Sequence, residues 1–399
     1  MGNLTRRDFI WKTTKATIGL TTTGLIPLRC ARLETAYEHR ERQPFYAFIL
    51  LGDLHYDRMS HHDMGWVERE KPNDVRQINE YVEITEKYTP RLLARVGEAV
   101  RTATTPVPFV IQVGDLTEGL CGSYDLQALQ FHDAIAMVEE LLPGVPFLVT
   151  KGNHDITGPG AAEAYDRVLL PWIGKQIGRD LKSASFSVTH DEDLFVFFDA
   201  YKRDLDWLEE TLAVNRGRRH VFFVIHPPVV PYNARSSWHI YSGPQEEAER
   251  GRLLALLGRC KAIVLSGHLH RYGLITRATP GGSFVQLGLN SVISSEEVKP
   301  RQVLEGVEQY GPDLVELEPD FSPDTVEQRR ELLKAEGPYI RHFEFADVAG
   351  HALFKVFADR VEMEVFIGFE PDVWKHRDLA KVGSLAEKRV LRANCVSSV

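Results

Sequence analysis

Two histidines stand two positions apart at the end of a strongly apolar segment. The segment VLSGHLH, residues 264–270, passes through a serine and a glycine to reach His268 and His270. Imidazole nitrogens are common metal ligands, and a glycine lets the backbone turn sharply. An isolated His-x-His pair is also found where one histidine makes a local hydrogen bond and the other faces water. The pair therefore indicates a metal site only if other segments supply partner ligands.

Four other apolar segments end in residues of the same kind. They are YAFILLGDLH, FVIQVGD, FLVTKGNHD and VFFVIH, which end in aspartate, asparagine or histidine. With the histidine pair they supply these candidate metal ligands: Asp53, His55, Asp115, Asn153, His226, His268 and His270. Nitrogen and oxygen donors without thiolate suit Mn, Fe, Zn or Co. The set is large enough for two ions that share one carboxylate, and such ion pairs hydrolyse phosphoesters.

The elements that must bring these residues together are strands and helices in alternation. Near-continuous apolar runs are typical of strands buried on both faces. Between these strands we expect helices over the following ranges: 90–104, 123–142, 204–214 and 246–259. Pro90 is suited to a first helical turn, and Ser123 is suited to an N-cap. The alternation predicts an α/β fold, in which ligands gather at the carboxyl ends of the strands.

The composition is that of an ordinary soluble globular protein. The chain has 399 residues, 43% hydrophobic and 26% charged, with a net charge of −9. This acidic balance argues against nucleic acid as a partner. No CxxC pair occurs among the four cysteines, which disfavours a sulfur-ligated zinc site or a dithiol redox centre and leaves one disulfide open. The sequence contains no apolar run of about 18 residues, so no integral membrane segment is predicted in the mature protein.

The first 31 residues predict an export signal. TRRDFIWK, residues 5–12, precedes the weakly apolar ATIGLTTTGLIPL, as a charged region precedes the apolar region of a signal. The segment resembles the twin-arginine (Tat) signal at these positions: Thr5, Arg6, Arg7, Phe9, Ile10 and Lys12. The resemblance implies the Tat export machinery as a partner and a periplasmic or extracellular location. The sequence leaves open whether the signal is cleaved, whether Cys30 is lipidated, and whether an uncleaved signal anchors the protein. The alternative to an export signal is an amphipathic N-terminal helix.

The five strand ends resemble the five motifs of the calcineurin-like metallophosphoesterases. The matching motifs are Asp53-x-His55, Gly114-Asp115, Gly152-Asn153-His154-Asp155, His226 and Gly267-His268-x-His270. The resemblance covers residues 45–295. It implies a four-layer α/β/β/α sandwich made of two mixed sheets with helices outside. It also implies dinuclear-metal-dependent hydrolysis of a small-molecule phosphoester, either a phosphomonoester or a phosphodiester.

The resemblance further assigns roles to the site residues. Two divalent or trivalent metal ions would be held, one by Asp53, His55 and His270, the other by Asn153, His226 and His268. Asp115 would bridge the two ions, and metal-activated hydroxide would attack phosphorus. His154 would act as the general acid, and Asp155 would hold its imidazole in place.

Two neighbouring interpretations are less favoured by the sequence. Purple acid phosphatases have a tyrosine ligand three residues beyond the Gly-Asp aspartate and lack the first-motif histidine. Here Glu118 occupies that position and His55 is present, which is closer to the bacterial phosphatase and phosphodiesterase branch. A non-catalytic binding module of the same fold is the alternative from another class. Such a module would have lost ligands, whereas every ligand position is filled here.

We expect three parts along the chain: a signal segment over 1–31, a metallophosphoesterase catalytic domain over 44–297, and a C-terminal extension over 298–399. The small α+β extension would pack on the catalytic domain. Within it, we expect a helix over 322–337 with Ser322 as N-cap, two strands joined at 358–360, and a surface helix over 375–392.

Two loops are expected to border the site. The first contains His61, His62 and Asp63, which we interpret as part of a substrate-facing loop. The second follows His226 and is long for a plain connection. Its candidates for contacting the leaving group are Arg235, Trp238, His239 and Tyr241.

Overall fold

The computed structural model describes residues 43–233, 239–316 and 326–382. Several of the predictions fall outside these ranges. They concern the signal segment 1–31 with Cys30, the loop residues Arg235 and Trp238, the N-cap Ser322, and residues 383–392 of the last predicted helix.

Two mixed β-sheets form the centre of the described chain. The first sheet has the strand order β14-β13-β12-β1-β2-β3, and the second has the order β10-β11-β8-β9-β7-β6-β5-β4. The first-sheet strands are β1 (Tyr46–Leu51), β2 (Val110–Gln112), β3 (Phe147–Val149), β12 (Gly350–Val356), β13 (Val361–Ile367) and β14 (Lys375–Asp378). The second-sheet strands are β4 (Phe186–His190), β5 (Asp193–Phe197), β6 (Val221–Val224), β7 (Ile263–Ser266), β8 (Tyr272–Thr279), β9 (Gly282–Gly288), β10 (Val303–Glu305) and β11 (Ile340–Ala346).

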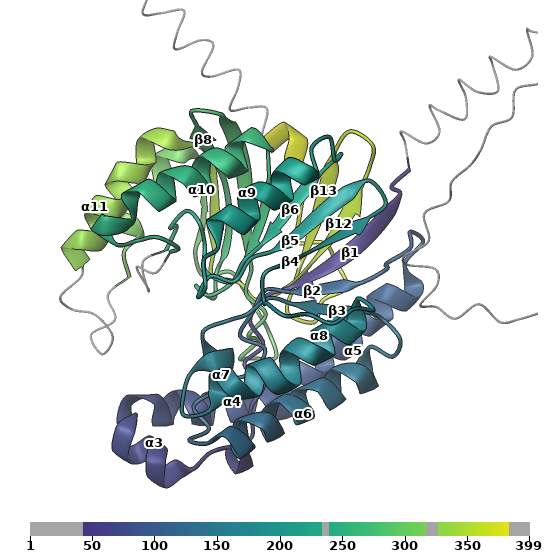
Figure 1. Ribbon diagram of the computed structural model, residues 1–399, viewed down its shortest axis with the longest axis vertical. Coiled ribbons are helices and arrows are strands. Elements are labelled where there is room, and N and C mark those ends of the chain that lie inside the picture. The colour runs from purple at the N-terminus through teal and green to yellow at the C-terminus, as the bar shows by residue number, and fades with distance from the viewer. Residues whose placement is uncertain (1–42, 234–238, 317–325, 383–399) are drawn as a thin grey trace, which may run out of the picture.

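Helices cover the outer face of each sheet (Figure 1). Those on the side of the first sheet are α4 (Val75–Lys87), α5 (Thr89–Thr102), α6 (Tyr124–Leu141), α7 (Ala161–Ala164) and α8 (Leu170–Gln176), with α3 (Met64–Glu70) at the end of this layer that lies farthest from the strands. Those beside the second sheet are α9 (Leu205–Val214), α10 (Glu247–Arg259) and α11 (Val326–Glu336). The predicted four-layer α/β arrangement is therefore confirmed. The four predicted helices correspond to α5, α6, α9 and α10, and Ser123 caps α6 by accepting a hydrogen bond from the Leu126 amide.

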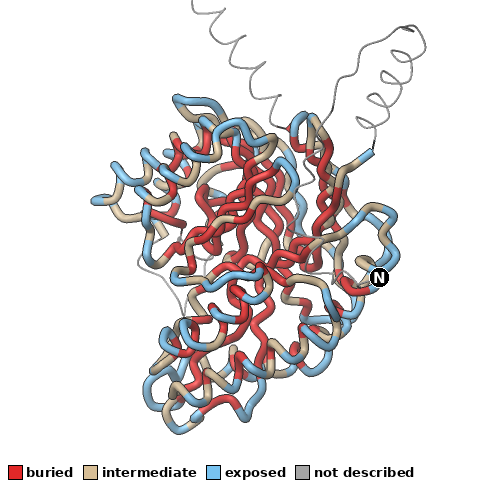
Figure 2. Tube along the Cα trace, turned by 45° about the vertical axis from the view of Figure 1, so that its right-hand side comes forward, coloured by how far each residue is buried: buried red, intermediate tan, exposed pale blue. Residues whose placement is uncertain are grey.

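The apolar runs form sheets because successive side chains of a strand point to opposite faces. In β5, Phe195 and Phe197 pack between the two sheets, while Leu194 and Val196 pack beneath the helices α9 and α10. A strand covered on both faces needs apolar residues at every position, which explains the unbroken runs in the sequence. Figure 2 shows the strands as the most deeply buried part of the chain.

The C-terminal residues take part in both sheets. β12 pairs antiparallel with β1 along its whole length, and β13 pairs with β12 across the predicted turn at 358–360. In the second sheet, β11 pairs antiparallel with β8. The extension therefore does not lie on a finished catalytic unit as a separate layer, because its strands are hydrogen-bonded members of the two central sheets.

The expected helix over 375–392 is wrong at its start, where Lys375–Asp378 forms strand β14. The reason is an ionic cluster between the sheets. Lys375 Nζ lies 3.0 Å from Glu344 Oε2, and Arg377 Nε lies 2.6 Å from Glu344 Oε1. Lys375 and Arg377 are two residues apart, and both can reach the buried carboxylate of Glu344 only if they point to the same face. Residues two apart share a face in a strand.

The packing between the sheets gives a first prediction. Phe48 of β1 is fully buried, and its ring centroid lies 5.4 Å from that of Phe195 and 5.1 Å from that of Phe222 in the second sheet. Replacing Phe48 with alanine should reduce the free energy of unfolding by about 3–5 kcal/mol, because it leaves a cavity between the sheets. Leu129→Ala, at a half-exposed position on α6, is the matched control and should change stability little. Chemical denaturation measures both variants, and equal losses would contradict this account of the core.

Candidate metal centre

The carboxyl ends of five strands meet at one edge of the two sheets. β1, β2 and β3 of the first sheet are parallel neighbours, and so are β6 and β7 of the second. The strands therefore end on the same side, and their following loops bring together all the predicted ligands: Asp53, His55, Asp115, Asn153, His226, His268 and His270. The structure thus unites every residue of the predicted ligand set.

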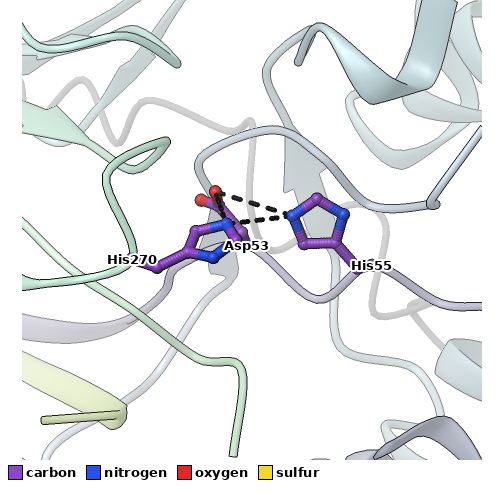
Figure 3. A group of neighbouring side chains, drawn as sticks. All are labelled: Asp53, His55 and His270. Atoms are coloured by element: carbon purple, nitrogen blue, oxygen red, sulfur yellow. Dashed lines mark hydrogen bonds and ion pairs between the residues drawn. The ribbon is translucent and has the colours of Figure 1, made fainter. Parts of the chain in front are cut away.

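The first donor group consists of Asp53, His55 and His270 (Figure 3). His270 Nε2 lies 2.9 Å from Asp53 Oδ2 and 3.0 Å from His55 Nε2. The backbone amide of His268 donates to both Asp53 oxygens, at 3.0 and 2.9 Å, which fixes the carboxylate. Three donor atoms from two sheets therefore converge on one point.

The second donor group consists of Asp115, His226 and His268, with Asn153 beside them. His226 Nε2 lies 3.1 Å from Asp115 Oδ2, 3.1 Å from Asn153 Oδ1 and 3.2 Å from His268 Nδ1. Asp115 also reaches toward the first group, since its Oδ2 is 3.7 Å from His55 Nε2. Asp115 thus lies between the two donor groups.

The chemistry of this donor set fits metal ions. Metal–ligand bonds of about 2.0–2.2 Å place adjacent ligands about 3 Å apart, which is the spacing found here. His226 Nδ1 donates to the carbonyl of Val113 at 2.8 Å, and His55 Nδ1 lies 2.7 Å from Glu118 Oε2. These contacts on the outer nitrogens leave the Nε2 lone pairs directed into the site, as is usual for metal-binding histidines.

The electrostatic setting agrees with this assignment. Burial lowers the pKa of His55 and of His268 well below the ordinary value, so both imidazoles are neutral ligands. Burial opposes ionisation of Asp115, but His226, His154 and His55 together hold its pKa well below the ordinary value. Burial also opposes protonation of His226, but Asp115 and Asp53 raise the pKa of this imidazole to about 9. His55, His268 and Asp115 therefore already have the charge state of metal ligands, whereas His226 must release a proton when a divalent cation binds.

The backbone at the site adopts unusual conformations. His55, Asp115, His268 and His270 have φ angles of 45°, 52°, 71° and 50°. Non-glycine residues rarely occupy this left-handed region, and such strain is concentrated at functional sites. The strain turns each side chain off the end of its strand and into the shared space.

Glycine is required where two of these loops approach one another. A Cβ on Gly267 would overlap Asp53 Oδ1, and a Cβ on Gly152 would overlap Asp115 Oδ1. The glycines beside the ligands therefore allow these loops to approach one another closely, as their positions in the sequence predict.

His154 lies at the edge of the donor set but is held by a partner other than the one expected. Its Nδ1 donates to the Glu118 carbonyl at 2.7 Å and lies 3.3 Å from Glu118 Oε2. Asp155 instead accepts hydrogen bonds from the amides of Asp115, Thr117 and Gly152, at 3.1, 3.1 and 2.9 Å. The expected contact between Asp155 and the imidazole is therefore wrong, because the tight turn after β3 directs this carboxylate toward three otherwise unsatisfied amides.

The loop containing His61 and His62 also differs from the expectation. Both side chains are buried: His61 Nε2 lies 3.0 Å from Asp133 Oδ2, and His62 Nε2 lies 2.8 Å from Asp57 Oδ1. Asp63 accepts a hydrogen bond from the Trp66 amide at 3.1 Å and thereby caps α3. His61 and His62 therefore stabilise the loop from within, and Asp63 serves as a helix cap.

The second loop is described only in part. His239 and Tyr241 are buried, and the Tyr241 hydroxyl donates to the Arg203 carbonyl at 3.3 Å. The Tyr241 hydroxyl is therefore turned toward the loop after β5.

Sequence reasoning did not identify the contribution of α4 to the site. Gln77 Nε2 donates to Glu118 Oε1 at 2.7 Å, and the Tyr81 ring stacks on His55 with a centroid distance of 4.2 Å. Tyr81 therefore packs directly on the candidate ligand His55, and Gln77 orients Glu118, which contacts the same imidazole. Their helix carries only an amphipathic pattern, so nothing in its sequence indicates which side chains meet a site built elsewhere.

The family model of the calcineurin-like phosphoesterases matches residues 46–272, and the chain belongs to this family. The chain is 22% identical over 267 residues to the serine/threonine-protein phosphatase CPPED1 of Pongo abelii, across 65% of this chain and 76% of that protein. Family membership and the histidine–aspartate groups together make the chain a phosphoesterase with donors for divalent metal ions.

One solved structure supports the fold, and another is similar to a lesser degree. A dimetal phosphatase from Danio rerio is similar with a TM-score of 0.50 and 15% identity, over 84% of this chain and 99% of that chain. A purple acid phosphatase from yellow lupin (Lupinus luteus) seeds has a TM-score of 0.47 and 12% identity, over 84% of this chain and 53% of that chain. Among the described residues, no helix is long and apolar enough to cross a membrane.

Proposed function

We propose that the chain hydrolyses a phosphoester at a dinuclear metal centre. The observation that carries this proposal is the position of Asp115, whose Oδ2 lies 3.1 Å from His226 Nε2 and 3.7 Å from His55 Nε2. One carboxylate between two converging donor groups is the arrangement that a shared, bridging ligand needs. Two divalent ions supply activation of water and neutralisation of charge on the phosphoryl group.

The ligand assignment follows from the two donor groups. Asp53, His55 and His270 hold one ion, and Asn153, His226 and His268 hold the other, with Asp115 common to both. The first sheet supplies four of these side chains and the second sheet supplies three. Each ion would therefore take ligands from both sheets, so the packing of one sheet on the other would be needed to complete each ligand set.

The general acid in this proposal is His154. Its Nδ1–H is committed to the Glu118 carbonyl, so the Nε2 nitrogen is left to carry the transferable proton. Glu118 also contacts His55 and Gln77, so the acid is oriented by a group that is itself fixed on two sides. Protonation of the leaving oxygen by such a group lowers the barrier to P–O cleavage. Asp155 joins the turn that carries His154 to the loop that carries Asp115, by accepting hydrogen bonds from the amides of Gly152 and Asp115.

A substrate panel tests the proposed reaction. It contains p-nitrophenyl phosphate, bis(p-nitrophenyl) phosphate, nucleotide mono- and diesters and a phosphoserine peptide, each with Mn²⁺ and with Zn²⁺. The peptide is included because the curated relative is named as a protein phosphatase. We expect turnover of at least one ester class, loss of turnover with a chelator, and recovery with added metal. Bound metal without turnover of any ester would instead support the non-catalytic binding module.

We also propose that the protein is exported by the Tat pathway. Its site gathers ligands from five separated segments and forms only when the chain folds, so metals are best bound before export. A pathway that carries folded proteins suits this requirement. Replacing Arg6 and Arg7 with lysine should leave an active, metal-bound enzyme inside the cell. Arg29→Lys with Arg32→Lys is the matched control, and it should be exported normally.

Cell fractionation followed by an activity assay distinguishes the two variants. Full recovery of the Arg6→Lys, Arg7→Lys protein in the periplasm would show that residues 1–31 have another role.

A further inference from the structure

A second cavity lies at the opposite end of the strands from the metal centre. Its volume is about 650 Å³, and it is lined by the loops that precede β6 and β7 and by the turn between β12 and β13. The loop before β6 ends at His220, and the ligand His226 follows the same strand. At about 3.3 Å per residue, the cavity and the metal centre are roughly 20 Å apart. The two sites are therefore separate.

The lining of this cavity is strongly basic. Its cationic residues are Arg216, Arg218, Arg219, Arg259, Lys261 and Arg360. The only acidic residue in the lining is Asp359. Six cationic side chains against one carboxylate are a marked local excess in a chain whose net charge is −9. Such a concentration of one sign raises the local concentration of anions.

Two of these cations are already neutralised by the protein. Arg219 pairs with Asp193 and with Asp191, and Arg360 pairs with Asp359 and with Glu362. These ion pairs hold the walls of the cavity in place and leave little charge for a ligand.

The remaining arginines are not neutralised in the same way. Arg218 reaches only the neutral Asn215 Oδ1, at 3.4 and 3.3 Å, and no carboxylate of the described residues pairs with Arg216. Arg259 lies 3.7 Å from Glu209 Oε1 and its side chain is 59% exposed, so this contact is weak. Guanidinium groups from the loop before β6 and from the end of α10 therefore line the same cavity with unused donors.

We propose that this cavity binds a small anion that carries two or more phosphate groups. The planar guanidinium fork matches phosphate oxygens better than a point charge does. The volume falls in the range of about 300–1,000 Å³ that small-molecule sites occupy. We propose more than one phosphate because the guanidinium groups come from two separate segments, the loop before β6 with Arg216 and Arg218, and the end of α10 with Arg259. Among the described residues, every group with metal-binding spacing lies at the other centre, so the anion is bound here and is not hydrolysed.

Binding of tripolyphosphate to the full-length, metal-loaded protein tests this proposal. Isothermal titration calorimetry is run on the wild type, on Arg216→Glu with Arg218→Glu, and on Lys175→Glu with Lys182→Glu. All four residues are exposed, and the two double variants change the net charge equally. Turnover of p-nitrophenyl phosphate should be unchanged in all three proteins, which shows that the metal centre is intact and that differences in binding arise elsewhere.

We expect the arginine variant to bind tripolyphosphate at least about tenfold more weakly than the wild type, and the lysine variant to bind it normally. Inorganic phosphate should bind the wild type more weakly than tripolyphosphate does. Equal affinity in the wild type and the arginine variant would overturn the proposal. An equal loss in both double variants would also overturn it, because it would show an effect of net charge alone. The neutral double variant Arg216→Gln with Arg218→Gln checks that the loss does not arise because reversed charges disturb the loop. It should also bind tripolyphosphate more weakly than the wild type.

Discussion

Replacing Asp115 with asparagine is expected to lower turnover by about 10³-fold or more and to reduce the bound metal. Asp115 is the carboxylate placed between both donor groups, through the oxygen that lies near His226 and His55. An asparagine has nearly the same shape, and its oxygen can still accept the hydrogen bond that Asp115 Oδ1 receives from the His154 amide. Its amide nitrogen has no lone pair for a metal, however, so the bridge is lost while the turn is kept.

The control for this variant is Asp133→Asn. Asp133 is a partly exposed carboxylate that contacts His61 and lies outside the donor groups. Metal content, measured by mass spectrometry, and turnover should both remain near wild type in the control. Retention of two metals and of wild-type turnover by Asp115→Asn would contradict the bridging role.

Replacing His154 with alanine is expected to leave both metals bound but to lower turnover by about 10²–10⁴-fold. The imidazole is held by Glu118 at the rim of the site, and its backbone amide, which donates to Asp115, is unaffected by the substitution. The loss should be largest for esters with basic leaving groups, because these need protonation most. Aryl phosphates with activated leaving groups should lose much less.

A series of aryl phosphates of increasing leaving-group pKa measures this difference. His132→Ala, at an exposed position on α6, is the matched control and should show the wild-type dependence on leaving group. Loss of metal from the His154→Ala protein would make His154 a ligand and would overturn its assignment as the acid.

The donor set could be predicted from the sequence because its signal is local. Each segment combines an apolar run with a polar donor at its end, and in four of the five a glycine stands beside the donor, as in the run that ends at His268. Parallel strands of one sheet end on the same side, so five such endings imply one site. The structure brings these residues together as that argument requires, and it adds the strained backbone at four of them.

The features that could not be predicted from the sequence depend on contacts between distant segments. The alternation of β12 and β13 is visible in the sequence, but their place beside β1 depends on pairing across about 300 residues. The partner of His154 is another case. Asp155 is its neighbour in sequence, yet the buried Glu118 holds the imidazole, because the fold places Asp155 against three backbone amides. Local patterns therefore identify the donors but not the groups that orient them.

The metal content of the purified full-length protein tests the dinuclear centre most directly. Mass spectrometry is combined with turnover of the best ester from the substrate panel, before and after chelation. The arrangement of Asp53, Asp115, Asn153 and the four histidines predicts two metal ions per chain, with turnover that is lost on chelation and restored when two equivalents return. Full turnover by a protein that holds no metal, or that holds only one ion, would contradict a centre bridged by Asp115.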